Sequence, residues 1–190
     1  MSDVESAAVG TVPAATGTRA AWLATAIGIP VYGALALLMS YISAPLVDML
    51  APDRNTVEDL GIFLGVAVVN VSIALVGIMI IAHTAGRLLF ARTLTRPTRS
   101  AAIAFAVMGS TLAVIPVVFV AFAQPLHLVG TLYAALAIGV PCGVTSGFTR
   151  AVLPAVAASR SATRTAAAVG IGGVVVVILW SAVVLFGVGR

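Results

Sequence analysis

Apolar residues in this chain form five long runs, and each run is bounded by polar or charged residues. Every run is close to the roughly 20 residues that an α-helix needs to cross the hydrocarbon core of a bilayer. The predicted helices are residues 20–43, 60–82, 101–123, 128–148 and 166–188. The pattern predicts an all-α fold, a polytopic membrane bundle of five transmembrane helices.

Composition agrees with this fold class. Hydrophobic residues make up 61% of the 190 residues and charged residues 8%, too little polar material to cover a soluble surface. Residues 1–18 mix small and polar residues without a basic start or an apolar centre, so they are predicted to be a flexible tail rather than a signal peptide. Residues 19–190 are predicted to form one bundle.

The connection between the first two runs extends from Pro45 to Asp59 and carries four acidic residues together with Arg54. Thr56, followed three positions later by Asp59, predicts a capping box at the start of the second helix. The acidic residues could attract cations or a basic partner, or the segment could be a solvated connection without a binding role. The sequence leaves both readings open.

Charge along the chain predicts the orientation of the helices. No acidic residue follows Asp59, and all ten cationic residues are arginines. Five crossings place eight of these arginines on the side of the N-terminal tail: Arg19 directly after the tail, and seven in the connections 87–99 and 150–164. Arg54 and Arg190 lie on the other side. Because short arginine-rich loops stay in the cytoplasm, the N-terminus is expected inside and the C-terminus outside.

The arginines also bear on the location and the partners of the protein. Arginine without lysine, beside abundant alanine, valine and glycine, is typical of a GC-rich bacterial genome, so a bacterial cell (plasma) membrane is expected. The arginines sit at the ends of the apolar runs and not along one continuous face, so no nucleic-acid partner is expected. The two helix pairs around the arginine-rich connections could be a duplicated unit or a coincidence of composition.

Small residues four positions apart let two membrane helices approach closely. The fourth run has the longest such stripe, and we take it as a helix-packing groove: Thr131, Ala135, Gly139, Gly143 and Gly147. This run is also the least hydrophobic of the five, which predicts a place at the centre of the bundle. The stripes could serve packing within the chain, or contact with a second copy or a partner helix.

Asn70 is the only amide in the middle of a predicted helix. By depth it falls into a midplane polar layer with four other residues, so that the layer is Tyr32, Asn70, Ser110, Thr111 and Cys142. The layer could line a pocket for a neutral or weakly polar ligand, or Asn70 could hydrogen-bond across a helix pair. Prolines inside three runs could expose backbone carbonyls to a ligand or merely kink their helices: Pro30, Pro116 and Pro141.

Several chemistries are disfavoured. No charged residue is predicted inside the hydrocarbon core, which argues against proton- or charge-coupled transport. His83 and His127 are expected at opposite membrane faces, so neither can act as the base for a serine nucleophile at Ser110 or Ser146. Cys142 is the only cysteine, which excludes an intrachain disulfide and a thiolate metal cluster. No catalytic residue, metal or cofactor is predicted, and the chain is not expected to be an enzyme.

The sequence therefore predicts a non-enzymatic multi-pass membrane protein, a packing or accessory subunit of a bacterial membrane assembly. Its expected partners are the lipid bilayer and other membrane helices, from a second copy or another subunit. The alternative is a small transporter or a membrane-embedded solute-binding subunit for a neutral or weakly polar ligand. A tightly packed bundle with no midplane cavity would dismiss that alternative. An enzyme acting on lipid headgroups would need acids at the interface, which only the outer connection offers.

Overall fold

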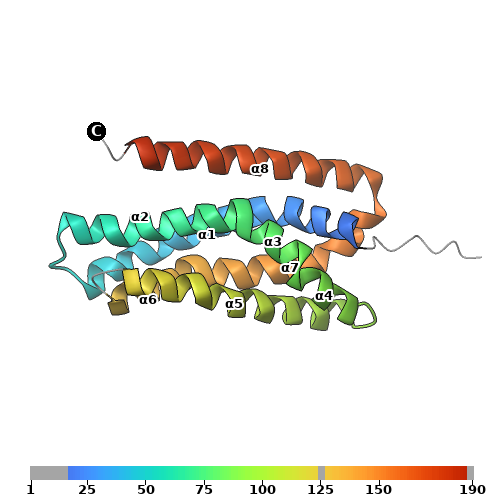
Figure 1. Ribbon diagram of the computed structural model, residues 1–190, viewed down its shortest axis with the longest axis horizontal. Helices are drawn as coiled ribbons and strands as arrows, with labels where there is room; N and C mark the ends of the chain where they lie inside the picture. The colour runs from blue at the N-terminus through green and yellow to red at the C-terminus, as the bar shows by residue number, and fades with distance from the viewer. Residues whose placement is uncertain (1–16, 124–126, 188–190) are drawn as a thin grey trace, which may run out of the picture.

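The computed structural model of the protein describes the backbone of residues 17–123 and 127–187, and the side chains of residues 17–123 and 128–182. Over the described backbone the fold is all-helical, without strands (Figure 1). Its elements are α1 (Thr18–Leu50), α2 (Thr56–Ser72), the π-helical turn η1 (Ile73–Gly77), α3 (Ile78–His83), α4 (Ala85–Arg92), α5 (Thr98–Ala123), α6 (His127–Ala134), the π-helical turn η2 (Ala135–Gly139), α7 (Val140–Ala158) and α8 (Arg160–Gly187).

Five stretches of continuous or nearly continuous helix are long and apolar enough to cross a membrane, as the apolar runs predicted. They are Thr18–Leu50, Thr56–His83, Thr98–Ala123, Leu128–Ala158 and Arg160–Ala182. Most of the predicted tail, residues 1–16, lies outside the described residues, as do residues 124–126 of the predicted turn between the third and fourth helices.

Several helices are longer than predicted. α8 begins at Arg160 and not at residue 166, and two others continue through a proline. α1 continues through Pro45 to Leu50, and α7 continues through Pro154 to Ala158, where the sequence predicted polar connections. Tertiary packing explains both extensions. Val47 is only 1% exposed and packs into a core cluster with α2, and Leu153 is buried against α1. Burial of these side chains offsets the hydrogen bond that each proline removes.

The second helix begins one residue earlier than the sequence indicated. Asn55, not Thr56, is the N-cap, and its Oδ1 accepts from the backbone N–H groups of Val57 and Glu58 at 3.0 Å each. Glu58 completes the capping box by accepting from the backbone N–H of Asn55 at 2.8 Å. The predicted Thr56–Asp59 capping box is therefore wrong, because Asp59 is paired with Arg54 instead.

This cap gives a direct stability prediction. Asn55→Ala removes the acceptor of two backbone N–H groups and should lower the free energy of unfolding by about 1 kcal/mol. Thr56→Ala is the matched control and should change it by less than about 0.5 kcal/mol, since no cap depends on that hydroxyl. Denaturant titration of the detergent-solubilised protein, followed by circular dichroism, measures both. An equal loss in the two variants would contradict the cap assignment.

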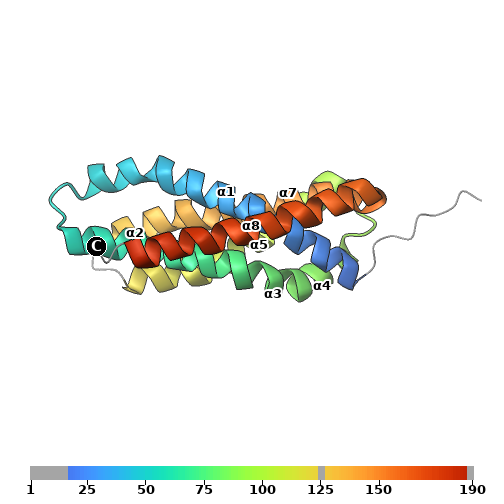
Figure 2. The same cartoon turned by 90° about the horizontal axis from the view of Figure 1, so that it is seen from above.

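The fourth long helix lies at the centre of the bundle and is the most buried of the five, as its low hydrophobicity predicted. α7 packs along α5 on one side and against α1 on the other. α8 packs mainly on α1 and stands apart from the rest of the bundle (Figures 1 and 2). The connection between α1 and α2 lies at one end of the bundle, and α4 and the α7–α8 connection lie at the opposite end (Figure 1).

The predicted packing groove is used over part of its length. A Cβ atom placed on Gly147 would lie 3.1 Å from the carbonyl oxygen of Ala102 on α5, and one on Gly143 would lie 3.4 Å from that of Ala106 and closer still to the Ser110 hydroxyl. These two glycines therefore hold α5 and α7 in contact.

The other end of the groove does not take part in this contact. A Cβ placed on Gly139 would have no neighbour within 4 Å. Ala135 is exposed and Thr131 is half-buried. The π-helical turn η2, which ends at Gly139, separates the two parts of the stripe. Because a π-turn inserts an extra residue, it rotates the preceding positions off the α7 packing face.

Candidate ligand-binding cavity

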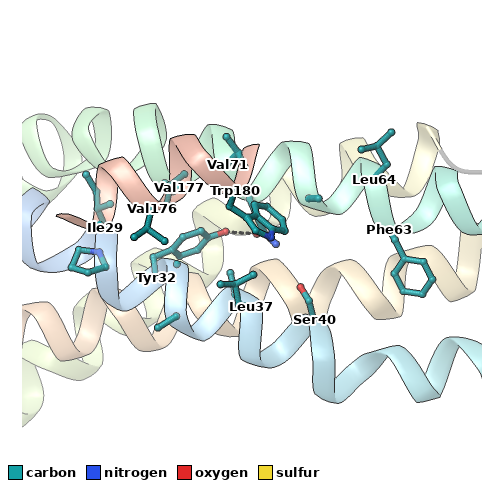
Figure 3. A pocket seen from close by; sticks show the side chains of 18 of the residues that line it. Ile29, Tyr32, Leu37, Ser40, Phe63, Leu64, Val71, Val176, Val177 and Trp180 are labelled. Atoms are coloured by element: carbon teal, nitrogen blue, oxygen red, sulfur yellow. Dashed lines mark hydrogen bonds between the residues drawn. The ribbon is translucent and has the colours of Figure 1, made fainter. Parts of the chain in front are cut away.

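A cavity of about 700 Å³ lies between α1, α2 with η1, and α8 (Figure 3). It runs from Phe63 and Leu64 at one end to Ile29 and Val176 at the other. Nearly all of its wall is apolar. α1 and α8 face each other across part of it, since Leu37 comes from α1 and Trp180 from α8. A volume of this size lies within the range of small-molecule sites in proteins.

Two polar side chains meet in this wall. The hydroxyl of Tyr32 on α1 donates a hydrogen bond to Asn70 Oδ1 on α2, with a distance of 2.6 Å. Tyr32 is 1% exposed and Asn70 is 7% exposed. The bond satisfies the Tyr32 hydroxyl hydrogen and Asn70 Oδ1 where water is scarce, which is how buried polar groups are normally accommodated. It also joins the first and second helices at the side of the cavity.

Local backbone structure places these groups. η1 begins three residues after Asn70, and its Ala74 packs against Tyr32 and also lines the cavity. Such π-helical turns inside α-helices recur at functional sites, because the extra residue changes which side chains face a neighbouring helix. Ala36 on α1 and Val177 on α8 pack around the same tyrosine.

The structure brings together only part of the predicted midplane polar layer. Tyr32 and Asn70 line the cavity, and Cys142 packs against the Tyr32 cluster from α7 without lining the cavity. Ser110 lies against Gly143 in the contact between α5 and α7. Thr111 is exposed and donates to the carbonyl oxygen of Val107 at 2.8 Å. Counting residues along each helix placed Tyr32 and Asn70 in one layer. It could not predict which face of α5 Ser110 and Thr111 occupy.

At one end the cavity reaches the connection between α1 and α2. Asp59 lines it there, and its carboxylate is bound by the guanidinium of Arg54, which also binds Asp48. Hydrogen bonds to these two carboxylates raise the pKa of the Arg54 side chain above its ordinary value. Arg54 therefore pairs an acid at the end of α1 with one at the start of α2.

The wall formed by α8 is the part of the cavity that the sequence did not indicate. Its lining residues are Val169, Gly173, Val176, Val177 and Trp180. A Cβ on Gly170 would lie 2.8 Å from the backbone of Ala26, and one on Gly173 would lie 3.1 Å from Pro30. These glycines hold α8 close to α1.

Among the predicted positions, that of Arg150 differs most clearly from the structure. The sequence assigned it to a connection after Phe148, but it lies inside α7 and is 5% exposed. Its guanidinium lies 5.0 Å from the ring centroid of Phe90 and 6.0 Å from that of Phe105, and it donates to the carbonyl oxygen of Thr93 at 3.4 Å. These contacts tie the end of α4 to α5 and α7, and cation–π attraction accommodates the buried charge.

Arg150 lies within the fourth membrane-length helix, Leu128–Ala158, two residues beyond the predicted run 128–148. It stands away from the cavity. Arg150 therefore connects α7 with α4 and α5 at the arginine-rich end of the bundle. The cavity itself has no arginine in its lining.

Fold and cavity together define a class: small all-helical proteins with five helices of membrane-spanning length and an apolar cavity between the first, second and last of them. Comparison of the chain with models of known protein families, with curated proteins and with solved structures gave no match. Among the described residues there is no cluster of metal-binding side chains.

Proposed function

We propose that this protein is a membrane-embedded binding or transport subunit for a neutral, largely apolar ligand. The observation that carries the proposal is the cavity of about 700 Å³ beside the Tyr32–Asn70 pair. An apolar wall with a few convergent polar groups is the usual composition of a ligand site. The protein acts by binding and not by catalysis.

The position of α8 supports access from the bilayer. This helix packs mainly on α1, and both α1 and α8 have few contacts with α2 along the cavity. A ligand dissolved in lipid would reach the cavity between these helices without crossing water. That route suits a molecule whose surface is mostly hydrocarbon.

Contact quenching tests this function. Trp180 lines the cavity, and bromine atoms quench indole fluorescence only at short range. In detergent, 1-bromododecane should quench Trp180 fluorescence saturably, with a Trp180→Phe variant supplying the background from Trp22. Quenching that rises linearly with the added bromoalkane, as simple partition into the micelle would produce, would contradict the proposal.

We further propose that the protein resides in a bacterial plasma membrane with its N-terminus in the cytoplasm and its C-terminus outside. The arginine-rich connection after α4 and the α7–α8 connection share one end of the bundle, and the acidic α1–α2 connection lies at the other (Figure 1). Arginine retention on the cytoplasmic side supports this orientation. A C-terminal reporter that is active only in the cytoplasm should stay inactive, and a strong signal would reverse the assignment.

A second candidate function is that of an accessory subunit that packs against another membrane protein. Ala168 and Gly172, four residues apart on α8, are exposed, and a Cβ placed on Gly172 would have no neighbour within 4 Å. In a Cys142→Ala background, Ala168→Cys should then crosslink to a partner in native membranes. Ile103→Cys, exposed on α5 at the same end of the bundle, is the control and should crosslink much less. Equal crosslinking would contradict this candidate.

A further inference from the structure

Asn70 offers the cavity a hydrogen-bond donor that the described residues leave unused. Asn70 Oδ1 accepts from Tyr32, but among the described residues nothing accepts from the Nδ2 group of Asn70. Asn70 is only 7% exposed and lines the cavity, so this amide group reaches the cavity surface instead of bulk water. The donor is therefore accessible from the cavity, where a ligand with an acceptor atom could pair with it.

Other polar groups in the wall cannot provide that partner. The Tyr32 hydroxyl hydrogen is already donated to Asn70. Asp59 lies eleven positions before Asn70 on the same helix, about 16 Å away at 1.5 Å per residue, and is paired with Arg54. Ser40 lies eight positions after Tyr32 on α1, about 12 Å further along. The Tyr133 hydroxyl, also in the wall, is hydrogen-bonded to Ser40, and the indole of Trp180 can only donate. The other lining side chains are apolar.

The shape of the cavity limits the ligand further. Its lining on the second helix extends from Asp59 to Ala74, fifteen positions or about 22 Å. No arginine lines it, which disfavours a carboxylate or phosphate, and its only carboxylate is engaged by Arg54, which disfavours an amine. An elongated neutral molecule with a hydrogen-bond acceptor remains.

We propose that the cavity selects elongated apolar molecules with a carbonyl group, whose oxygen accepts a hydrogen bond from Asn70 Nδ2. This inference rests on the proposed binding function and specifies the chemistry of its ligand. Tyr32 is a positioning residue in this arrangement. By donating to Oδ1 it fixes the rotation of the amide, so that Nδ2 and not Oδ1 faces the ligand.

Competition between two matched probes tests the inference. 2-Tridecanone and tridecane share the same chain length, and only the ketone carries an acceptor. Each is used to relieve the quenching of Trp180 by 1-bromododecane in the purified full-length protein. In the wild type the ketone should compete about 3- to 15-fold more strongly than the alkane, the range expected from one hydrogen bond within a membrane protein.

Two variants test whether Asn70 causes the preference for the ketone over the alkane. Tyr32→Phe/Asn70→Leu removes both polar groups together, so no group is left unpaired, and should bring the ratio of ketone to alkane competition close to one. Tyr32→Phe alone keeps the Nδ2 donor but frees the rotation of the amide, so the ratio of ketone to alkane competition should fall between the wild-type value and one. If the double variant does not fold, Asn70→Leu alone is measured for the same loss.

The outcomes separate the inference from the function on which it rests. Equal competition by ketone and alkane in the wild type overturns the carbonyl preference and leaves apolar binding in place. A ketone preference that persists in the Tyr32→Phe/Asn70→Leu variant also overturns it, because the donor would then lie elsewhere. Absence of saturable quenching by 1-bromododecane overturns both proposals.

Discussion

Gly109→Ala is expected to lower the free energy of unfolding by about 2–3 kcal/mol, although it adds a single methyl group. A Cβ at this position would lie 2.5 Å from the carbonyl oxygen of Cys142 on α7 and would also collide with the side chain of Ser146. The backbone oxygen cannot rotate away, so α5 must separate from α7 along the most extensive helix contact in the bundle. Denaturant titration in detergent measures the loss.

Gly172→Ala is the matched control for that experiment. Its Cβ would meet nothing within 4 Å, so only the backbone effect remains. Alanine in a helix interior is more favourable than glycine by about 0.5–1 kcal/mol, and the control should be unchanged or slightly more stable. If both variants lost the same amount, the close approach of α5 and α7 would not be the cause.

The second large effect is expected in ligand binding. Ala67 lies on α2 one turn before Asn70 and lines the cavity. Ala67→Phe places an aromatic ring in that space and should weaken the saturable quenching of Trp180 by 1-bromododecane at least about tenfold, a loss of about 1.4 kcal/mol or more. The ring enters a cavity and not a packed core, so the fold should tolerate it.

Ala167→Phe adds the same ring at an exposed position on α8 and should leave quenching unchanged. Thermal unfolding of both variants checks that each remains folded. Undiminished saturable quenching in Ala67→Phe would place the bromoalkane outside the cavity and remove the main support for the proposed function.

The helix ends show most clearly how much of the fold could be predicted from the sequence. The apolar runs predicted five membrane-length helices, because the length of a run and its hydrophobicity are local properties. The ends of α1 and α7 were misplaced because Pro45 and Pro154 weaken a helix locally, while burial of Val47 and Leu153 by other helices outweighs them. Such burial depends on partners distant in the sequence.

Arg150 illustrates the same limit for charge. In the sequence it resembles the other arginines of the connections, which are expected to lie in water. In the structure two phenylalanine rings from α4 and α5 enclose it, and the end of α4 provides the carbonyl oxygen of Thr93. Neither ring is near Arg150 in the chain, so its burial could not be derived from local pattern.

The candidate site divides in a similar way. Asn70 and Tyr32 could be singled out as polar residues at one depth, because depth follows from counting along a helix. Ser110 and Thr111 have a similar depth but face away from the cavity, because the rotation of α5 about its axis directs them elsewhere. Only packing against other helices determines that rotation. The cavity itself is formed where α8 meets α1 and α2, three helices whose contact faces carry few polar residues.

By itself the sequence determined the number of membrane-length helices and the central place of the fourth, because hydropathy and small-residue spacing are properties of each segment. Only the tertiary structure decided which small residues touch, which polar groups pair, where Arg150 is buried and where α8 leaves a cavity. Those features depend on the angle and register at which helices pack, and both are set by contacts between residues far apart in the chain.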